Sequence, residues 1–125
     1  MTQPARNAHD LSIVFDAYRP ILKPYIPNMM VVQDNERGVY LNTQSVMKNR
    51  QPLFFASLAI NKAYVSFHLF PVYMYPDLLD GIGDLVKRMQ GKSCFNFRKV
   101  DPSQVERMRA LVEAGYQRFK AEGDI

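Results

Sequence analysis

The sequence contains one cysteine, two histidines and no hydrophobic stretch that approaches the ~18 residues of a membrane-spanning helix. A lone Cys94 excludes an intramolecular disulfide and fits a reducing compartment. The polar start MTQPARNAHD lacks the apolar run of a signal peptide. We therefore expect a cytoplasmic protein that does not associate with membranes. The length of 125 residues predicts one domain, residues 1–125, with one hydrophobic core.

Acidic side chains are also missing over a long stretch, because no Asp or Glu lies between Arg37 and Pro76. Residues 37–100 hold nine basic and three acidic side chains, a net charge of +6, whereas residues 1–36 and 101–125 each carry −1. A positive middle favours anionic partners. The total of +4 is too small for a protein that packs DNA without specificity.

The N-terminal segment has the apolar spacing of a helix. We expect His9 or Asp10 to cap this helix, and Pro20 to end or kink it near Tyr18 or Arg19. The apolar positions are Leu11, Val14, Phe15, Tyr18, Ile21 and Leu22.

The C-terminal segment has the clearest helix signals. Asp101 is an N-cap residue with Pro102 at the first helical position, and Gly123 is a C-terminal stop. Gly115 lies within the apolar stripe and indicates a close approach of the helix to the sheet. The stripe consists of Val105, Met108, Leu111, Val112, Tyr116 and Phe119.

Strand-like runs fill the middle of the chain. Residues 29–33 and 38–43 predict two short strands around the turn DNER, and residues 44–52 are polar and predicted to be irregular. Residues 53–60 and 63–70 predict an antiparallel hairpin with the two-residue turn Asn61-Lys62. Residues 77–91 predict short helical turns broken at Gly81 and Gly83, and SCFNFRK predicts a last strand with Phe95 and Phe97 in the core.

Side chains alternate between the two faces of a strand, so the hairpin can be divided into a core face and an open face. The predicted turn pairs Ser57 with Ser66 and Phe55 with His68. The expected core face is Phe54, Ala56, Leu58 and Ile60 with Ala63, Val65, Phe67 and Leu69. The expected open face is Leu53, Phe55, Ser57 and Ala59 with Tyr64, Ser66, His68 and Phe70.

The order of elements predicts the fold class. A helix, four strands, a short helical link, a strand and a helix form an α+β two-layer sandwich, in which the N- and C-terminal helices cover one face of an antiparallel sheet. The uncovered face carries His68.

The stretch YVSFHLFPVYMYP, followed by MQGKSCFNFRKV and a final helix, resembles the YdhG-like bacterial domains of unknown function. The similarity is clearest from Tyr64 to Val100. It implies a frataxin-like fold, in agreement with the order of elements. One relative is regarded as a frataxin-like iron chaperone for iron–sulfur assembly, so the resemblance also implies an alternative function. Iron binding of the frataxin type relies on carboxylates, because hard iron ions prefer carboxylate oxygen. The carboxylates on the first helix and the adjoining strands are Asp10, Asp16, Asp34 and Glu36.

The mixed open face is the expected site of a non-enzymatic binding or adaptor domain. We expect it to bind a small anionic or aromatic ligand or a protein partner, with Lys92 at the rim of the site. No catalytic residue, cofactor or resident metal is expected. No pair of carboxylates has the spacing for general acid–base catalysis. The predicted lining residues are Ser57, Tyr64, Ser66, His68, Asn96 and Arg98.

A thiol-dependent enzyme is the second alternative, because His68 and Lys92 can lower the pKa of the Cys94 thiol. Cys94 and His68 are too few for a zinc site. The run QGKS lacks the first glycine of a Walker motif, but its backbone N–H groups, with Lys92 and Arg98, can hold a carboxylate or a phosphate. Nucleic acid is not expected as a partner, because the strand parity puts Phe95 and Phe97 in the core.

Overall fold

The computed structural model describes the backbone of residues 3–125 and the side chains of residues 11–125. Six antiparallel strands form one sheet with the order β1-β2-β3-β4-β6-β5. The strands are β1 (Met30–Asn35), β2 (Gly38–Val46), β3 (Pro52–Ile60), β4 (Val65–Leu69), β5 (Met89–Gln90) and β6 (Cys94–Phe97). The helical elements are α1 (Gln3–Leu22), η1 (Lys23–Asn28), α2 (Phe70–Met74), η2 (Pro76–Leu79), η3 (Gly83–Arg88) and α3 (Pro102–Ala121), where η marks a 3-10 helix.

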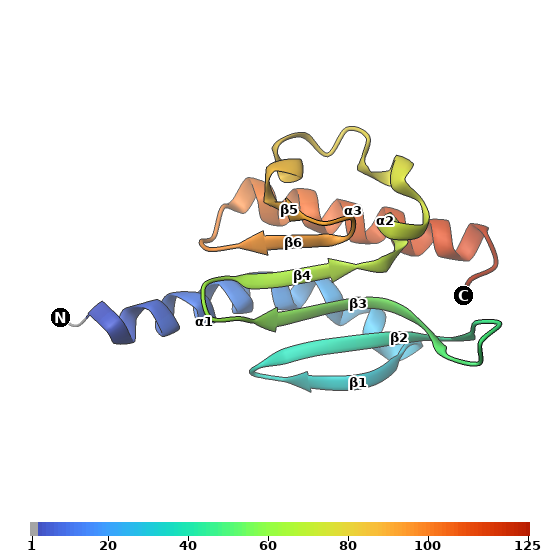
Figure 1. Cartoon of the computed structure of the whole chain (residues 1–125), viewed down its shortest axis with the longest axis horizontal. Coiled ribbons are helices and arrows are strands. Elements are labelled where there is room, and N and C mark those ends of the chain that lie inside the picture. The colour runs from blue at the N-terminus through green and yellow to red at the C-terminus, as the bar shows by residue number, and fades with distance from the viewer. Residues whose placement is uncertain (1–2) are drawn as a thin grey trace.

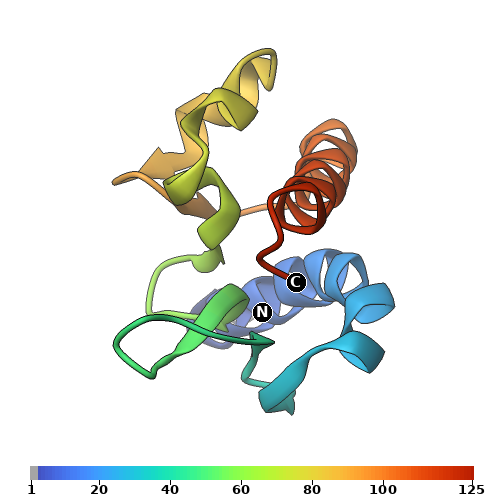
Figure 2. The ribbon, with the colours of Figure 1, turned by 90° about the vertical axis from the view of Figure 1, so that its right-hand side faces the viewer.

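The long helices α1 and α3 lie behind the sheet in Figure 1, so one face of the sheet is covered and the other is open. The view in Figure 2 places both helices on the same side of the strands. The segment from α2 to η3 packs against α3 at the β5 end of the sheet. This arrangement confirms the predicted α+β two-layer sandwich with both terminal helices on one face. None of the helices within residues 3–125 has the length and apolar character needed to cross a membrane.

Aromatic rings form the centre of the core between the helices and the sheet. Tyr18 of α1 stacks on Phe97 of β6, with ring centroids 4.2 Å apart, and meets Phe67 of β4 edge-on at 6.3 Å. Phe55 of β3 packs against Phe119 of α3 at 6.1 Å. All five side chains are almost completely buried, and full burial of a ring this size stabilises a fold by about 1.5 to 3 kcal/mol.

The helix α1 differs from its prediction at both ends. It begins at Gln3, so the predicted cap at His9 or Asp10 is wrong. It also continues through Pro20 to Leu22, so the first of the two alternatives for Pro20, an end near Tyr18 or Arg19, is wrong. Proline removes one backbone hydrogen bond, but Ile21 and Leu22 are fully buried after it, and their burial holds the last turn in place.

The helix α3 confirms its predicted signals. The Asp101 side chain accepts a hydrogen bond from the Ser103 backbone N–H at 3.0 Å, and the helix ends before Gly123, which has a φ of +81°. A Cβ atom added at Gly115 would lie 2.8 Å from Cβ of Pro71 and 4.0 Å from the Leu69 side chain. The close approach is therefore made mainly to α2, directly after strand β4.

The β3–β4 hairpin has a four-residue connection, residues 61–64, so the predicted two-residue turn is wrong. The Asn61 N–H donates to the Tyr64 carbonyl at 2.8 Å. A tight turn would require positive φ at Lys62, which a lysine resists. The register shifts by two positions, and Ser57 pairs with His68 instead of Ser66. Because the shift is even, Ser66 and His68 keep their predicted face, but Ala63 lies exposed in the turn and not in the core.

A β-bulge in β3 reverses the predicted faces at its start. Leu41 of β2 pairs with Ala56, but the next residue of β2, Asn42, pairs with Phe54. Phe55 is therefore an extra residue, and alternation breaks at this point. Leu53 and Phe55 are buried in the core, whereas Phe54 lies on the open face. The sequence prediction assigned these three side chains to the opposite faces.

Other predicted boundaries change less. The strand β2 runs to Val46, so the irregular connection to β3 is limited to residues 47–51 and not 44–52. The link after β4 forms short helical turns interrupted at Gly81 and Gly83, as predicted, and both glycines have positive φ. Phe95 and Phe97 lie in the core, which confirms their predicted parity. The two-residue strand β5 was not predicted.

Candidate functional site

A chain of hydrogen bonds crosses the open face from the β3–β4 turn to β5. Asn61 Nδ2 donates to Ser66 Oγ at 2.9 Å, and Ser66 Oγ donates to Asn96 Oδ1 at 2.9 Å. Asn96 Nδ2 then donates to Gln90 Oε1 at 2.6 Å. We call these four side chains the polar ladder. The amide of Asn96 is bonded to Ser66 through its oxygen and to Gln90 through its nitrogen, so the ladder fixes the orientation of Asn96.

Aromatic side chains occupy the other end of the open face, around Phe54. The Phe54 ring lies 4.9 Å from Tyr40 and 5.0 Å from the His68 ring, between ring centroids. It also lies 5.9 Å from Phe70, on which Tyr73 stacks at 5.3 Å. Tyr40 and Tyr73 are exposed. This surface can stack on a planar group. The predicted aromatic side chains of the open face were Phe55, Tyr64 and Phe70, and Phe54 takes the place of Phe55.

His68 lies between the aromatic side chains and the polar ladder. Its Nε2 atom shares a hydrogen bond of 2.6 Å with Oγ of Ser93, which is buried. Burial lowers the pKa of the His68 imidazole below its usual value, so the ring is neutral at pH 7. The Ser93 carbonyl also accepts from the Leu69 N–H at 2.9 Å. These contacts anchor His68 in the sheet, and its Nε2 atom is engaged by Ser93.

Cys94 pairs directly with His68 in the β4–β6 register. The thiol is half-buried, and burial raises its pKa. A reactive cysteine requires the opposite shift, because the thiolate is the nucleophile. The predicted neighbour Lys92 is exposed in the β5–β6 turn. The surroundings of Cys94 therefore favour a protonated thiol.

A pocket of about 480 Å³ opens where the polar ladder meets the edge of the sheet. Three cations line it: Lys87 and Arg88 at the end of η3, and Arg98 after β6. No acidic side chain lines it. The pocket is defined by Tyr64, Lys87, Arg88, Met89, Gln90, Asn96 and Arg98, and we call it the cationic pocket.

The charges in the cationic pocket are largely uncompensated. Lys87 lies 3.7 Å from Asp84, but both side chains are well exposed, and such ion pairs contribute at most about 1 kcal/mol. Among the described side chains, Arg88 and Arg98 form no ion pair. The Nε atom of Arg88 is buried and has no hydrogen-bond partner there. The lining of the pocket therefore combines three positive side chains with no acidic one.

The structure brings three of the seven predicted site residues together. Tyr64, Asn96 and Arg98 line the cationic pocket. Ser66 contacts the pocket only through its hydrogen bond to Asn96. The remaining predicted residues lie outside it: Ser57 is opposite His68 on the open face, His68 bonds to Ser93, and Lys92 is in the β5–β6 turn.

The sequence prediction missed Lys87, Arg88 and Gln90, which complete the pocket. They belong to the run LVKRMQ, which was interpreted as part of the helical link. The two adjacent cations, with a polar residue two positions after the second, could have indicated them. Their position beside Arg98 depends on the β5–β6 pairing, which places Gln90 opposite Cys94.

The acidic residues of the iron alternative lie apart from this pocket. Asp34 forms an ion pair with Arg19 at 2.8 Å, Asp16 is exposed on α1, and Glu36 lies in the β1–β2 turn. The side chain of Asp10 lies outside the described residues. Within the described part of the chain, no three His, Cys, Asp or Glu side chains are grouped as metal ligands.

Comparisons of the chain with models of protein families, with curated proteins and with solved structures found no match. The resemblance to the YdhG-like domains therefore stays a prediction.

Proposed function

We propose that the protein is a non-enzymatic binding domain that holds a small anionic ligand, a phosphate or a carboxylate, in the cationic pocket. The observation that carries this proposal is the pocket lining, which holds Lys87, Arg88 and Arg98 and no acidic side chain. An anion there would replace solvent as the partner of three positive charges. The electropositive middle of the sequence supports the same class of ligand.

The other lining residues suit recognition of a small oxyanion. Arg98 is a planar donor that binds carboxylates and phosphates through two parallel hydrogen bonds. Asn96 is held in position by its bonds to Ser66 and Gln90, so binding costs little side-chain entropy at this residue. Tyr64 supplies a hydroxyl and an aromatic face at the same pocket. A binding role needs no nucleophile, which agrees with the raised pKa of Cys94.

The proposal can be tested by calorimetry and thermal unfolding with inorganic phosphate, pyrophosphate and citrate at constant ionic strength. A ligand at a hundred times its dissociation constant stabilises the folded state by about 2.7 kcal/mol. We expect Arg98→Ala to weaken binding at least about tenfold, because a charge-assisted hydrogen bond contributes about 1.5 to 3 kcal/mol.

The matched control is Lys48→Ala, which removes one positive charge from the exposed loop between β2 and β3. It should leave the affinity within about twofold, since exposed charges further away than a Debye length of about 8 Å are screened. Equal losses in the two variants would show binding by net charge alone. That result, or the lack of any stabilisation by the three anions, would exclude the proposed site.

A further inference from the structure

The two edges of the sheet differ in length. The strand β5 at one edge has two residues, whereas β1 at the other has six, all of them exposed. Within the described residues, β1 pairs only with β2, so one side of its backbone has no strand partner. Figure 1 shows β1 as the outermost strand, with no element beyond it. Unpaired N–H and C=O groups along such an edge are a template for another strand.

The edge strand β1 also exposes consecutive apolar side chains. Met30, Val31 and Val32 are 56%, 45% and 63% exposed. Natural edge strands often carry lysine to prevent pairing, but β1 contains neither lysine nor arginine. Its only charged side chain, Asp34, is compensated by Arg19 at 2.8 Å. A bulge between Val31 and Gln33 increases the local twist but leaves the apolar side chains in solvent.

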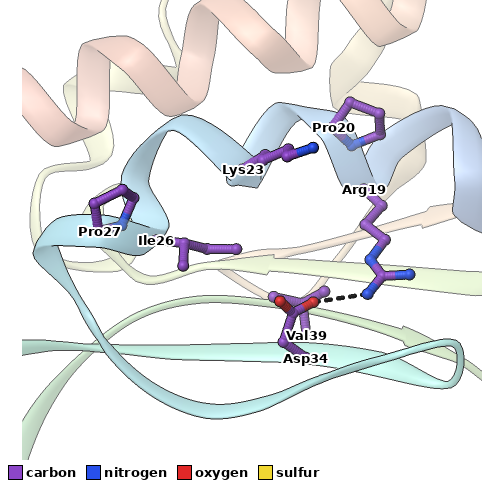
Figure 3. A pocket seen from close by; sticks show the side chains of 7 residues that line it. All are labelled: Arg19, Pro20, Lys23, Ile26, Pro27, Asp34 and Val39. Carbon is purple, nitrogen blue, oxygen red and sulfur yellow. Dashed lines mark hydrogen bonds and ion pairs between the residues drawn. The ribbon is translucent and has the colours of Figure 1, made fainter.

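A cavity of about 570 Å³ adjoins β1 on the helix-covered face. Figure 3 shows Arg19 of α1 reaching across it to Asp34 of β1. The second cation of this cavity, Lys23, forms no ion pair among the described residues. The lining consists of Arg19, Pro20, Lys23, Ile26, Pro27, Asp34 and Val39. The edge therefore has apolar walls and an uncompensated positive charge beside it.

We propose that β1 pairs with β1 of a second copy of this chain, antiparallel and about a two-fold axis through Val31, so that two sheets join into one. A two-fold contact requires a strand that complements itself. The first half of β1 is apolar and the second half, Gln33 to Asn35, is polar. An axis at Val31 places Met30 opposite Val32 of the other copy, so the apolar halves cover each other.

The charges do not oppose a second copy in this register. Asp34 then lies opposite Asn28 of the other copy, and the two Asp34 carboxylates are about 20 Å apart along the strands at 3.4 Å per residue. Repulsion over that distance is screened, because the Debye length is about 8 Å. The residues that face each other across the axis, Met30 to Val32, carry no charge, and Asp34 keeps its own partner Arg19. No like charges are therefore brought together when the apolar halves pair.

The test is sedimentation velocity of the full chain over a range of protein concentrations. We expect a reversible dimer with a dissociation constant in the micromolar range, because one strand pair buries little surface. Val32→Lys should weaken the dimer about tenfold or more, since it buries two unpaired ammonium groups. Val32 is well exposed in the single chain, so the variant should fold and should still bind phosphate.

The matched control is Val86→Lys, which changes a valine that is also well exposed, on η3 near the opposite edge of the sheet. It should leave the dimer constant unchanged. A monomer at every concentration, an equal effect of both lysine variants, or assembly that continues beyond a dimer would each overturn the proposal.

A cysteine cross-link tests the register. In antiparallel pairs, directly opposed Cα atoms are about 4.5 to 5.5 Å apart, which suits a disulfide. Val31→Cys should therefore give a disulfide-linked dimer under mild oxidation, whereas Val46→Cys, at the far end of β2, should not. Equal yields from the two variants would contradict an axis at Val31.

Discussion

The two faces of the sheet are held by different forces. On the covered face, rings such as Phe67 and Phe97 pack on Tyr18 and are shielded from water. On the open face, polar side chains that are exposed or half-buried bond to one another from Asn61 to Gln90. Packing of buried rings contributes several kcal/mol per residue, and a partly exposed hydrogen bond about 1. The covered face therefore supplies stability, and the open face is free to serve binding.

The strongest test of this comparison uses two neighbours in the sequence. The bulge in β3 places Phe55 in the core against Phe119, and Phe54 on the open face against Tyr40. We expect Phe55→Ala to reduce the free energy of unfolding by about 3 to 5 kcal/mol, because it leaves a cavity. Phe54→Ala should cost less than about 2 kcal/mol, because its ring is partly exposed. Urea unfolding at equilibrium measures both values.

Each phenylalanine variant is the control for the other, since the chemical change is the same. Simple alternation along β3 predicts the reverse order, with Phe54 in the core. A larger loss for Phe54→Ala would therefore contradict the bulge and the assignment of the faces.

A smaller effect is expected on the open face itself. Ser66→Ala removes the hydroxyl that accepts from Asn61 and donates to Asn96. The free energy of unfolding should fall by about 0.5 to 1.5 kcal/mol, the usual net value of a hydrogen bond. Phosphate binding should also weaken, because Asn96 loses one of the two bonds that orient it. Urea unfolding and calorimetry measure the two effects.

Ser57→Ala is the matched control, since Ser57 lies on the same face and forms no side-chain hydrogen bond within the described residues. Its stability should stay within about 0.5 kcal/mol of the parent protein. Similar losses in the two serine variants would mean that the polar ladder contributes nothing beyond local packing.

Local signals made part of the fold predictable. Asp101 and Pro102 mark the start of α3 because capping involves only neighbouring residues. The alternation around Phe95 and Phe97 gave the correct faces because β6 has no bulge. The errors arose where a partner strand decides the outcome. The face of Phe55 depends on where β2 shifts its pairing, and no property of β3 alone reveals that shift.

The candidate site shows the same division. Tyr64, Asn96 and Arg98 were predicted because they share the open face of predicted strands. Lys87 and Arg88 come from the helical link, and they reach the same pocket only because β5 pairs with β6. A residue that enters a site from an irregular segment has no periodicity that assigns it to a face.

The smallest predicted effect concerns the pH dependence of stability through His68, the open-face imidazole. Burial lowers its pKa in the folded state, so the unfolded chain takes up a proton more readily. Stability is therefore fully present above the unfolded pKa of about 6.5 and is lost as the pH falls toward the folded pKa. The groups around the ring, Phe54 and Ser93, do not titrate, and burial raises the pKa of Cys94 further above this pH range.

The measurement is urea unfolding of the parent protein and of His68→Gln between pH 8 and pH 5. Glutamine can still bond to Ser93 but does not titrate, so the variant should lose less stability than the parent as the pH falls. His9 is present in both proteins and cancels in the comparison. Identical slopes in the two proteins would mean that His68 is solvated like a surface histidine. The open face would then be wetter than its contacts with Phe54 and Ser93 indicate, and the contrast between the two faces of the sheet would be sharper still.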